Sequence, residues 1–200
     1  MSTNNFSPFV IGWMSIVTGV IAILAVIFLI LMSTVNMSFG KVNDVFNGLI
    51  GISSLILAWM LYAEHYAKSP LMSQIALLCV VVGMIFTIIG SVLIIYGYTG
   101  FVLAGFYTAL GNAFIGLWLA LFCYAMQNGD VFPRNLVTIG LIVSAFLALG
   151  LICIQGIFAG TDSMNSLPWY LYLGLSSFLG TYILYPIWAI WLGRILLSKQ

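Results

Sequence analysis

The chain has 200 residues, of which 64% are hydrophobic and only 4% are charged, and its formal net charge is +1. A soluble globular domain carries charge on about a quarter of its residues, so this composition excludes a water-soluble body and indicates that hydrocarbon surrounds most of the chain. The small net charge provides no basic surface for phosphate contacts, which excludes nucleic acid as a partner.

Six apolar segments are each long enough to cross a bilayer, whose hydrocarbon core of about 30 Å requires about 20 helical residues. Lipid offers no partner to backbone N–H and C=O groups, so each segment is predicted to be a helix. The first segment has no lysine or arginine before it and is too long for a signal peptide, so we expect a permanent span. The predicted spans are 8–33, 46–63, 71–96, 101–126, 136–159 and 169–196.

Short links rich in glycine, proline, serine and asparagine separate these segments, as at Asn36–Gly40 and Gly97–Gly100. Links of this length force consecutive helices to be antiparallel neighbours. The sequence therefore predicts an all-α integral membrane protein, a bundle of six transmembrane helices that forms a single polytopic domain over residues 1–200.

The positions of lysine and arginine predict the direction of insertion. Lys68, Arg134, Arg194 and Lys199 belong to the side that holds both termini, whereas only Lys41 belongs to the other side. Because positively charged short loops are retained in the cytoplasm, we expect both termini to be cytoplasmic in a cell membrane, either plasma or inner.

Small residues recur at helical intervals in four of the predicted spans. Lipid is as apolar as leucine, so helices in a bilayer associate where small side chains let the backbones approach closely. These stripes predict packing within the bundle; alternatively, one of them faces a membrane-protein partner or a second copy in a homo-oligomer. The stripes are Gly12, Ser15, Gly19 and Ala22; Ala76, Gly83, Gly90 and Gly97; Gly105, Ala109, Ala113, Gly116 and Ala120; and Gly140, Ser144, Ala148, Gly156 and Gly160.

Every ionisable residue is predicted to lie at or beyond the end of a span. A charge in the middle of a bilayer costs at least about 2.5 kcal/mol and is usually retained for a function, so this pattern disfavours proton pumps and voltage sensors. Glu64 and His65 are adjacent, but neighbours on a helix diverge by about 100° and do not converge on one substrate atom. The three cysteines are scattered through apolar segments, so we expect no metal site and no cofactor.

Uncharged polar side chains inside the last three spans are the remaining candidates for a binding site. Two hypotheses explain them: they line one cavity that opens to the outside, or they form hydrogen bonds between helices that fix the packing. Thr108 and Asn112 are four residues apart and share a helix face. The candidates are Tyr107, Thr108, Asn112, Gln155, Thr181 and Tyr182.

Pro186 lies inside the sixth predicted span. It has no N–H to donate to the carbonyl of Tyr182, so the helix is predicted to kink there and to provide a candidate hinge.

Three functions are compatible with these observations. The leading hypothesis is a non-enzymatic membrane protein that packs with partner subunits or binds a lipid or an uncharged small molecule. The second is a transporter or channel for a neutral solute, acting through the region of Asn112, Gln155 and Tyr182. The third is a membrane enzyme that uses Glu64 and His65.

Overall fold

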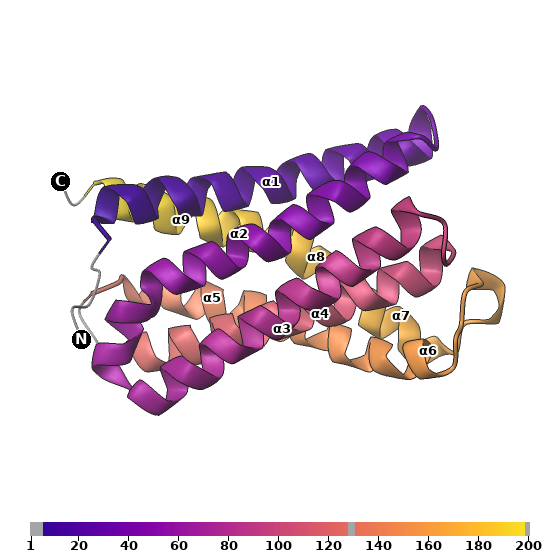
Figure 1. The fold of residues 1–200 in the computed structure, drawn as a ribbon. Coiled ribbons are helices and arrows are strands. Elements are labelled where there is room, and N and C mark those ends of the chain that lie inside the picture. The colour runs from indigo at the N-terminus through magenta and orange to yellow at the C-terminus, as the bar shows by residue number, and fades with distance from the viewer. Residues whose placement is uncertain (1–5, 128–130, 199–200) are drawn as a thin grey trace.

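The computed structural model describes residues 6–127 and 131–198, with side chains for all of these except residues 63–65, 67, 68 and 166 (Figure 1). Helices and short links make up these described residues, and no strand occurs among them. Six helical segments are long and apolar enough to cross a membrane, which confirms the predicted number of spans. The direction of insertion stays a prediction.

Four spans are single helices and two are composite. The single helices are α1 (Pro8–Thr34), α2 (Phe39–Lys68), α3 (Pro70–Ile95) and α4 (Phe101–Met126). The fifth span joins α5 (Arg134–Ala148), the 3₁₀ segment η1 (Leu149–Cys153) and α6 (Ile154–Phe158), and a short 3₁₀ turn η2 (Met164–Ser166) follows it. The sixth span joins α7 (Trp169–Leu175), α8 (Ser177–Leu179), the π-helical segment η3 (Gly180–Leu184) and α9 (Tyr185–Leu197).

The spans form a closed ring in which each packs on the next and α9 returns to pack on α1. The start of α1 and the end of α9 lie at one end of the bundle, together with the α2–α3 and α4–α5 links (Figure 1). We call this the terminal end. The opposite, distal end holds the α1–α2 and α3–α4 links and the link between α6 and α7 (Figure 1). This alternation confirms the expected antiparallel neighbours.

The second span begins earlier than the sequence predicts. Helix α2 starts at Phe39 instead of residue 46, because Asn43, Asp44 and Asn47 are buried inside the bundle although they lower the local hydropathy. Asp44 therefore stands within the candidate span Phe39–Tyr62. This differs from the expectation that every ionisable residue lies at or beyond a span end.

The small-residue stripe of α1 faces α9. A Cβ atom added at Gly12 would lie 3.1 Å from the carbonyl oxygen of Gly193, and one added at Gly19 would lie 3.1 Å from that of Pro186. Between them, the Ser15 hydroxyl donates a hydrogen bond of 2.6 Å to the carbonyl of Ala189. The two backbones approach because no side chain separates them, as the sequence predicts for packing within the bundle.

The other stripes contact neighbouring helices in the same way, except at Gly97, Gly105 and Gly160, where an added Cβ would meet nothing within 4 Å. Gly83 and Gly90 of α3 lie against the backbone of α4, and Gly116 of α4 lies against α5. Gly97 instead ends α3 with a φ of +72°, a conformation that favours glycine. Gly160 follows span five with a φ of +61°, whereas Gly105 is the exception that lies inside a helix.

The outside of the bundle is apolar, as expected for a surface in contact with lipid. Large hydrophobic side chains remain about half exposed along several spans, for example Trp59 at 59%, Ile187 at 54% and Leu78 at 63%. The core instead holds aromatic side chains such as Trp118 and Trp188, whose rings meet edge to face at 6.3 Å. The distribution supports a membrane-embedded protein.

Span six changes its helical register just before Pro186. The N–H of Tyr185 donates to the carbonyl of Gly180, which is the i→i−5 pattern of a π-helix. Pro186 cannot donate to the carbonyl of Tyr182, and the wider turn lies directly upstream of its ring. A change of helical register thus lies beside Pro186, while the predicted kink and hinge stay predictions.

Candidate functional site

A partly enclosed cavity of about 190 Å³ lies in the distal half of the bundle. We call it the distal cleft. Its walls come from three parts of the chain: α1, the first two turns of α4, and the distal half of span six with the link before it. The lining residues are Leu29, Phe101, Val102, Gly105, Met164, Leu175, Phe178 and Tyr182.

The path of span six creates this cleft. Its distal part, α7, packs on η1 and α4, whereas its other half, α9, packs on α1 and α5. Near the terminal end α1 packs on span six through α9. Near the distal end span six has turned away from α1, because α7 packs on η1 and α4 instead (Figure 1). Gly105 of α4 leaves the space open because it carries no side chain.

A buried chain of hydrogen bonds begins at the deep side of the cleft. The Tyr182 hydroxyl donates to Asn47 Oδ1 at 2.9 Å, and Asn47 Nδ2 donates to Asn43 Oδ1 at 3.1 Å. Asn43 Nδ2 in turn donates to the carbonyl of Ala25 in α1 at 2.7 Å. The chain thus connects span six, α2 and α1, and it fixes the position of the Tyr182 ring.

Two further contacts hold Tyr182 and its helix in place. The Phe178 ring stacks on the Tyr182 ring, with centroids 5.4 Å apart and planes 12° apart. One turn further along, the hydroxyls of Tyr185 and Ser54 are hydrogen-bonded at 2.8 Å. Tyr182 of the π-helical segment and Tyr185 at the start of α9 thus both meet polar positions of α2.

Tyr182 is the one member of the predicted six-residue set that lines the distal cleft. Its neighbour Thr181 is buried and donates to the carbonyl of Ser177 in its own span at 3.3 Å. Thr108 is also buried, donates to the carbonyl of Ala104 at 3.3 Å, and packs against Gly90 of α3. The hydroxyls of Thr108 and Thr181 are thus paired within their own helices.

The other three candidates lie apart from one another. Tyr107 stacks on Phe86 of α3, with ring centroids 6.3 Å apart. Gln155 is exposed on the outside of span five. Asn112 is 1% exposed, and its Nδ2 atom has no hydrogen-bond partner. The structure therefore does not gather the six residues around one cavity.

Sequence reasoning missed the asparagines of α2. The signal was present, since Asn43 and Asn47 are four residues apart and Ser54 follows seven later, which places all three on one helix face. They were overlooked because a polar stretch beside a link resembles the end of a span.

The described residues contain no cluster of groups that could hold a metal ion. No three histidine, cysteine or acidic side chains come together there. Cys79, Cys123 and Cys153 are all free thiols. The side chains of Glu64 and His65, the pair behind the enzyme hypothesis, lie outside the described part of the chain.

No protein-family model matches the sequence, and neither a curated protein nor a solved structure matches it significantly.

Proposed function

We propose that this chain is a non-enzymatic multi-pass membrane protein that binds a lipid chain or an uncharged small molecule in the distal cleft. The observation that carries the proposal is the cleft itself, an apolar space closed on its deep side by a tyrosine whose position is fixed.

The chemistry of the walls selects the class of ligand. Aliphatic and aromatic side chains line the cleft and none of its lining residues is charged. A charged group would lose its hydration there without gaining a partner, whereas an apolar group gains dispersion contacts. The volume of about 190 Å³ is below the usual range of about 300–1,000 Å³ for drug-sized ligands, which favours a small molecule or the end of an acyl chain.

Tyr182 adds one polar preference. Its hydroxyl proton is used in the hydrogen bond to Asn47, so a lone pair of the same oxygen remains to accept a hydrogen bond. A ligand with one hydroxyl at the end of an apolar body can donate to this oxygen. It therefore suits the deep side of the cleft better than a ligand whose polar group can only accept a hydrogen bond.

Packing of the small-residue stripes supports a ligand more than a partner subunit. At Gly12, Gly19, Gly83 and Gly116 the stripe is already in contact with a neighbouring helix of the same bundle. Gly105 is the stripe position that faces the cleft instead.

Photolabelling tests the proposal directly. A diazirine derivative of a long-chain alcohol, added to membranes containing the protein, is expected to label Met164 and the segment Leu175–Phe178 above the level of the lipid-facing surface. Gly105→Phe is designed to place a ring in the cleft, because Gly105 lines it and a Cβ added there meets nothing within 4 Å. If the substitution removes about 1 kcal/mol of binding free energy, labelling of the cleft falls roughly fivefold.

The matched control is Ala145→Phe, which adds the same ring at an exposed position of α5 away from the cleft and should leave labelling unchanged. Equal labelling of the cleft and the lipid-facing surface would contradict the proposal. So would native mass spectrometry that finds a bare monomer, with no retained lipid or small molecule, after extraction in mild detergent.

Transport of a neutral solute is the second candidate, and one observation favours it. Asn112 Nδ2 and Ser177 Oγ are both buried without a hydrogen-bond partner, so a passing solute could pair with them. Flux into liposomes should then fall in Asn112→Leu, and flux equal to that of empty liposomes would remove this candidate.

A further inference from the structure

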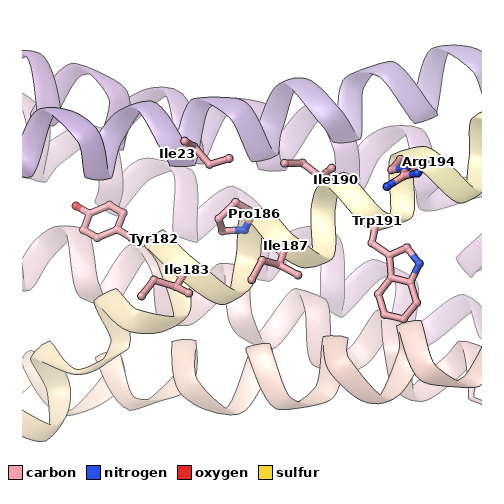
Figure 2. A pocket seen from close by; sticks show the side chains of 8 residues that line it. All are labelled: Ile23, Tyr182, Ile183, Pro186, Ile187, Ile190, Trp191 and Arg194. Carbon is pink, nitrogen blue, oxygen red and sulfur yellow. The ribbon is translucent and has the colours of Figure 1, made fainter.

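A second apolar hollow, of about 480 Å³, runs along the outer surface of α9 (Figure 2). We call it the α9 groove. Ile23 of α1 forms one edge, and the remaining lining residues all come from span six. They are Tyr182, Ile183, Pro186, Ile187, Ile190, Trp191 and Arg194.

The groove has the length of one membrane leaflet. Tyr182 and Arg194 are twelve residues apart (194 − 182), which corresponds to about 18 Å along a helix. Half of a bilayer's hydrocarbon core is about 15 Å, so a groove that starts at Tyr182 in mid-membrane ends at the headgroup level. The Ile183 and Ile187 side chains are 50% and 54% exposed, which leaves the groove open to the surrounding lipid.

The two ends of the groove differ in chemistry. The wall is aliphatic from Ile183 to Ile190, whereas Trp191 and Arg194 lie toward the terminal end, with their side chains on opposite sides of α9 (Figure 2). Tryptophan is enriched at the membrane–water interface, and the guanidinium of arginine presents a planar set of donors that matches a phosphate. The aliphatic wall thus suits an acyl chain and the Arg194 end suits a phosphate. These two parts follow one another along the groove in the same order as in a phospholipid.

Arg194 is available for such a contact. It is exposed in the last turn of α9, and both carboxylates whose side chains the structure describes, Asp44 and Asp162, lie near the distal end. No described carboxylate therefore competes for the guanidinium.

We propose that the α9 groove is a binding site for an anionic phospholipid in the leaflet at the terminal end. One acyl chain lies along Ile183, Pro186 and Ile187, and the lipid phosphate pairs with the Arg194 guanidinium. The groove and the distal cleft share Tyr182 and each takes one residue from α1, but the groove continues along α9 toward Arg194, whereas the cleft continues toward α4, η2 and α7.

Quenching of Trp191 fluorescence by brominated lipids tests the site. The protein is reconstituted in phosphatidylcholine bilayers containing increasing fractions of brominated phosphatidylglycerol or brominated phosphatidylcholine. The difference between the wild type and Trp191→Phe isolates the signal of Trp191. A charge contact at the membrane surface contributes about 1 kcal/mol, so half-maximal quenching is expected at a roughly fivefold lower fraction of the anionic lipid.

Two substitutions separate the site from general surface charge. Arg194→Gln should remove the preference for phosphatidylglycerol, whereas Arg134→Gln, at an exposed position at the same end of the bundle, should keep it. Ile187→Phe should weaken quenching by both lipids, because the added ring occupies the path of the acyl chain.

Three outcomes would overturn the proposal. The first is an equal response of the wild type to both brominated lipids. The second is an equal loss of preference in Arg134→Gln and Arg194→Gln, which would indicate a diffuse electrostatic effect. The third is the absence of Trp191-dependent quenching, which would indicate that a protein partner covers the groove.

Discussion

The Asp162 carboxylate stabilises a helix to which it does not belong. It lies in the link after span five, yet it accepts hydrogen bonds from the backbone N–H groups of Gly100 and Leu103, the latter at 3.0 Å. The first N–H groups of a helix have no partner within the helix and carry partial positive charge, so a carboxylate is a suitable cap. Gly100, the residue at the cap position of α4, has no side chain with which to do this.

Removing this cap should lower stability. Asp162→Ala is expected to lower the free energy of unfolding by about 1 kcal/mol, and Asp162→Asn by less, because its amide keeps one acceptor oxygen. Unfolding in mixed detergent micelles, followed by tryptophan fluorescence, provides the measurement. Asn165→Ala, an exposed position three residues further on, serves as the control. An equal effect of the two alanine variants would contradict the capping role.

Two buried asparagines should respond in opposite ways to the same substitution. Asn47 accepts from Tyr182 and donates to Asn43, so Asn47→Leu leaves two buried groups unpaired and should destabilise the protein by about 1–2 kcal/mol. The Nδ2 atom of Asn112 has no partner, so Asn112→Leu should be neutral or stabilising.

Unfolding of both variants under the same conditions gives the comparison. A cycle with Tyr182→Phe isolates the Asn47–Tyr182 contact, for which a coupling energy of about 1 kcal/mol is expected. A coupling energy near zero, or a large loss of stability in Asn112→Leu, would show that these hydrogen bonds do not describe the energetics of this region.

At the scale of elements, contact between backbones decides how α1 meets span six. Gly12 and Gly19 allow α1 to touch carbonyl groups of α9, and the Ser15 hydroxyl bonds to a third carbonyl between them. This contact closes the ring of helices, and the divergence of α7 from α1 beyond it leaves the distal cleft open. Small residues therefore explain both the tight half and the open half of the same pair of spans.

A pair of glycine substitutions separates these halves. A Cβ at Gly19 would lie 2.7 Å from Ile190 Cγ1 and 3.1 Å from the Pro186 carbonyl oxygen, so Gly19→Leu should destabilise the bundle by about 1–3 kcal/mol. Gly105→Leu places the same side chain in open space and should be tolerated. Thermal unfolding in detergent measures both, and equal losses would contradict the difference in packing.

At the scale of the whole molecule, the features that could be predicted from the sequence are those that depend on a local pattern of residues. Hydropathy located six spans and their antiparallel order, and the spacing of Gly12, Ser15 and Gly19 predicted close packing within the bundle. Pro186 marked the region where span six is interrupted.

What depends on distant parts of the chain could not be predicted in this way. The burial of Asn47 depends on Tyr182, which is 135 residues away in sequence, and the cap at Gly100 depends on Asp162, 62 residues away. The distal cleft has walls from α1, α4 and span six, so its shape follows from the paths of helices and not from one sequence motif. For the same reason, Tyr107 and Gln155 pointed away from the shared cavity that their polarity suggested.

Cysteine labelling in intact cells tests the central claim, which is that six spans cross a membrane and leave both ends of the bundle exposed to different compartments. Single cysteines replace Ser7, Met37, Tyr98 or Ser198, all exposed, after Cys79, Cys123 and Cys153 are changed to alanine. A membrane-impermeant maleimide should label Met37→Cys and Tyr98→Cys in intact cells, and Ser7→Cys and Ser198→Cys only after permeabilisation. Labelling of all four positions from one side would contradict the six-span account, and the reverse pattern would contradict the predicted direction of insertion.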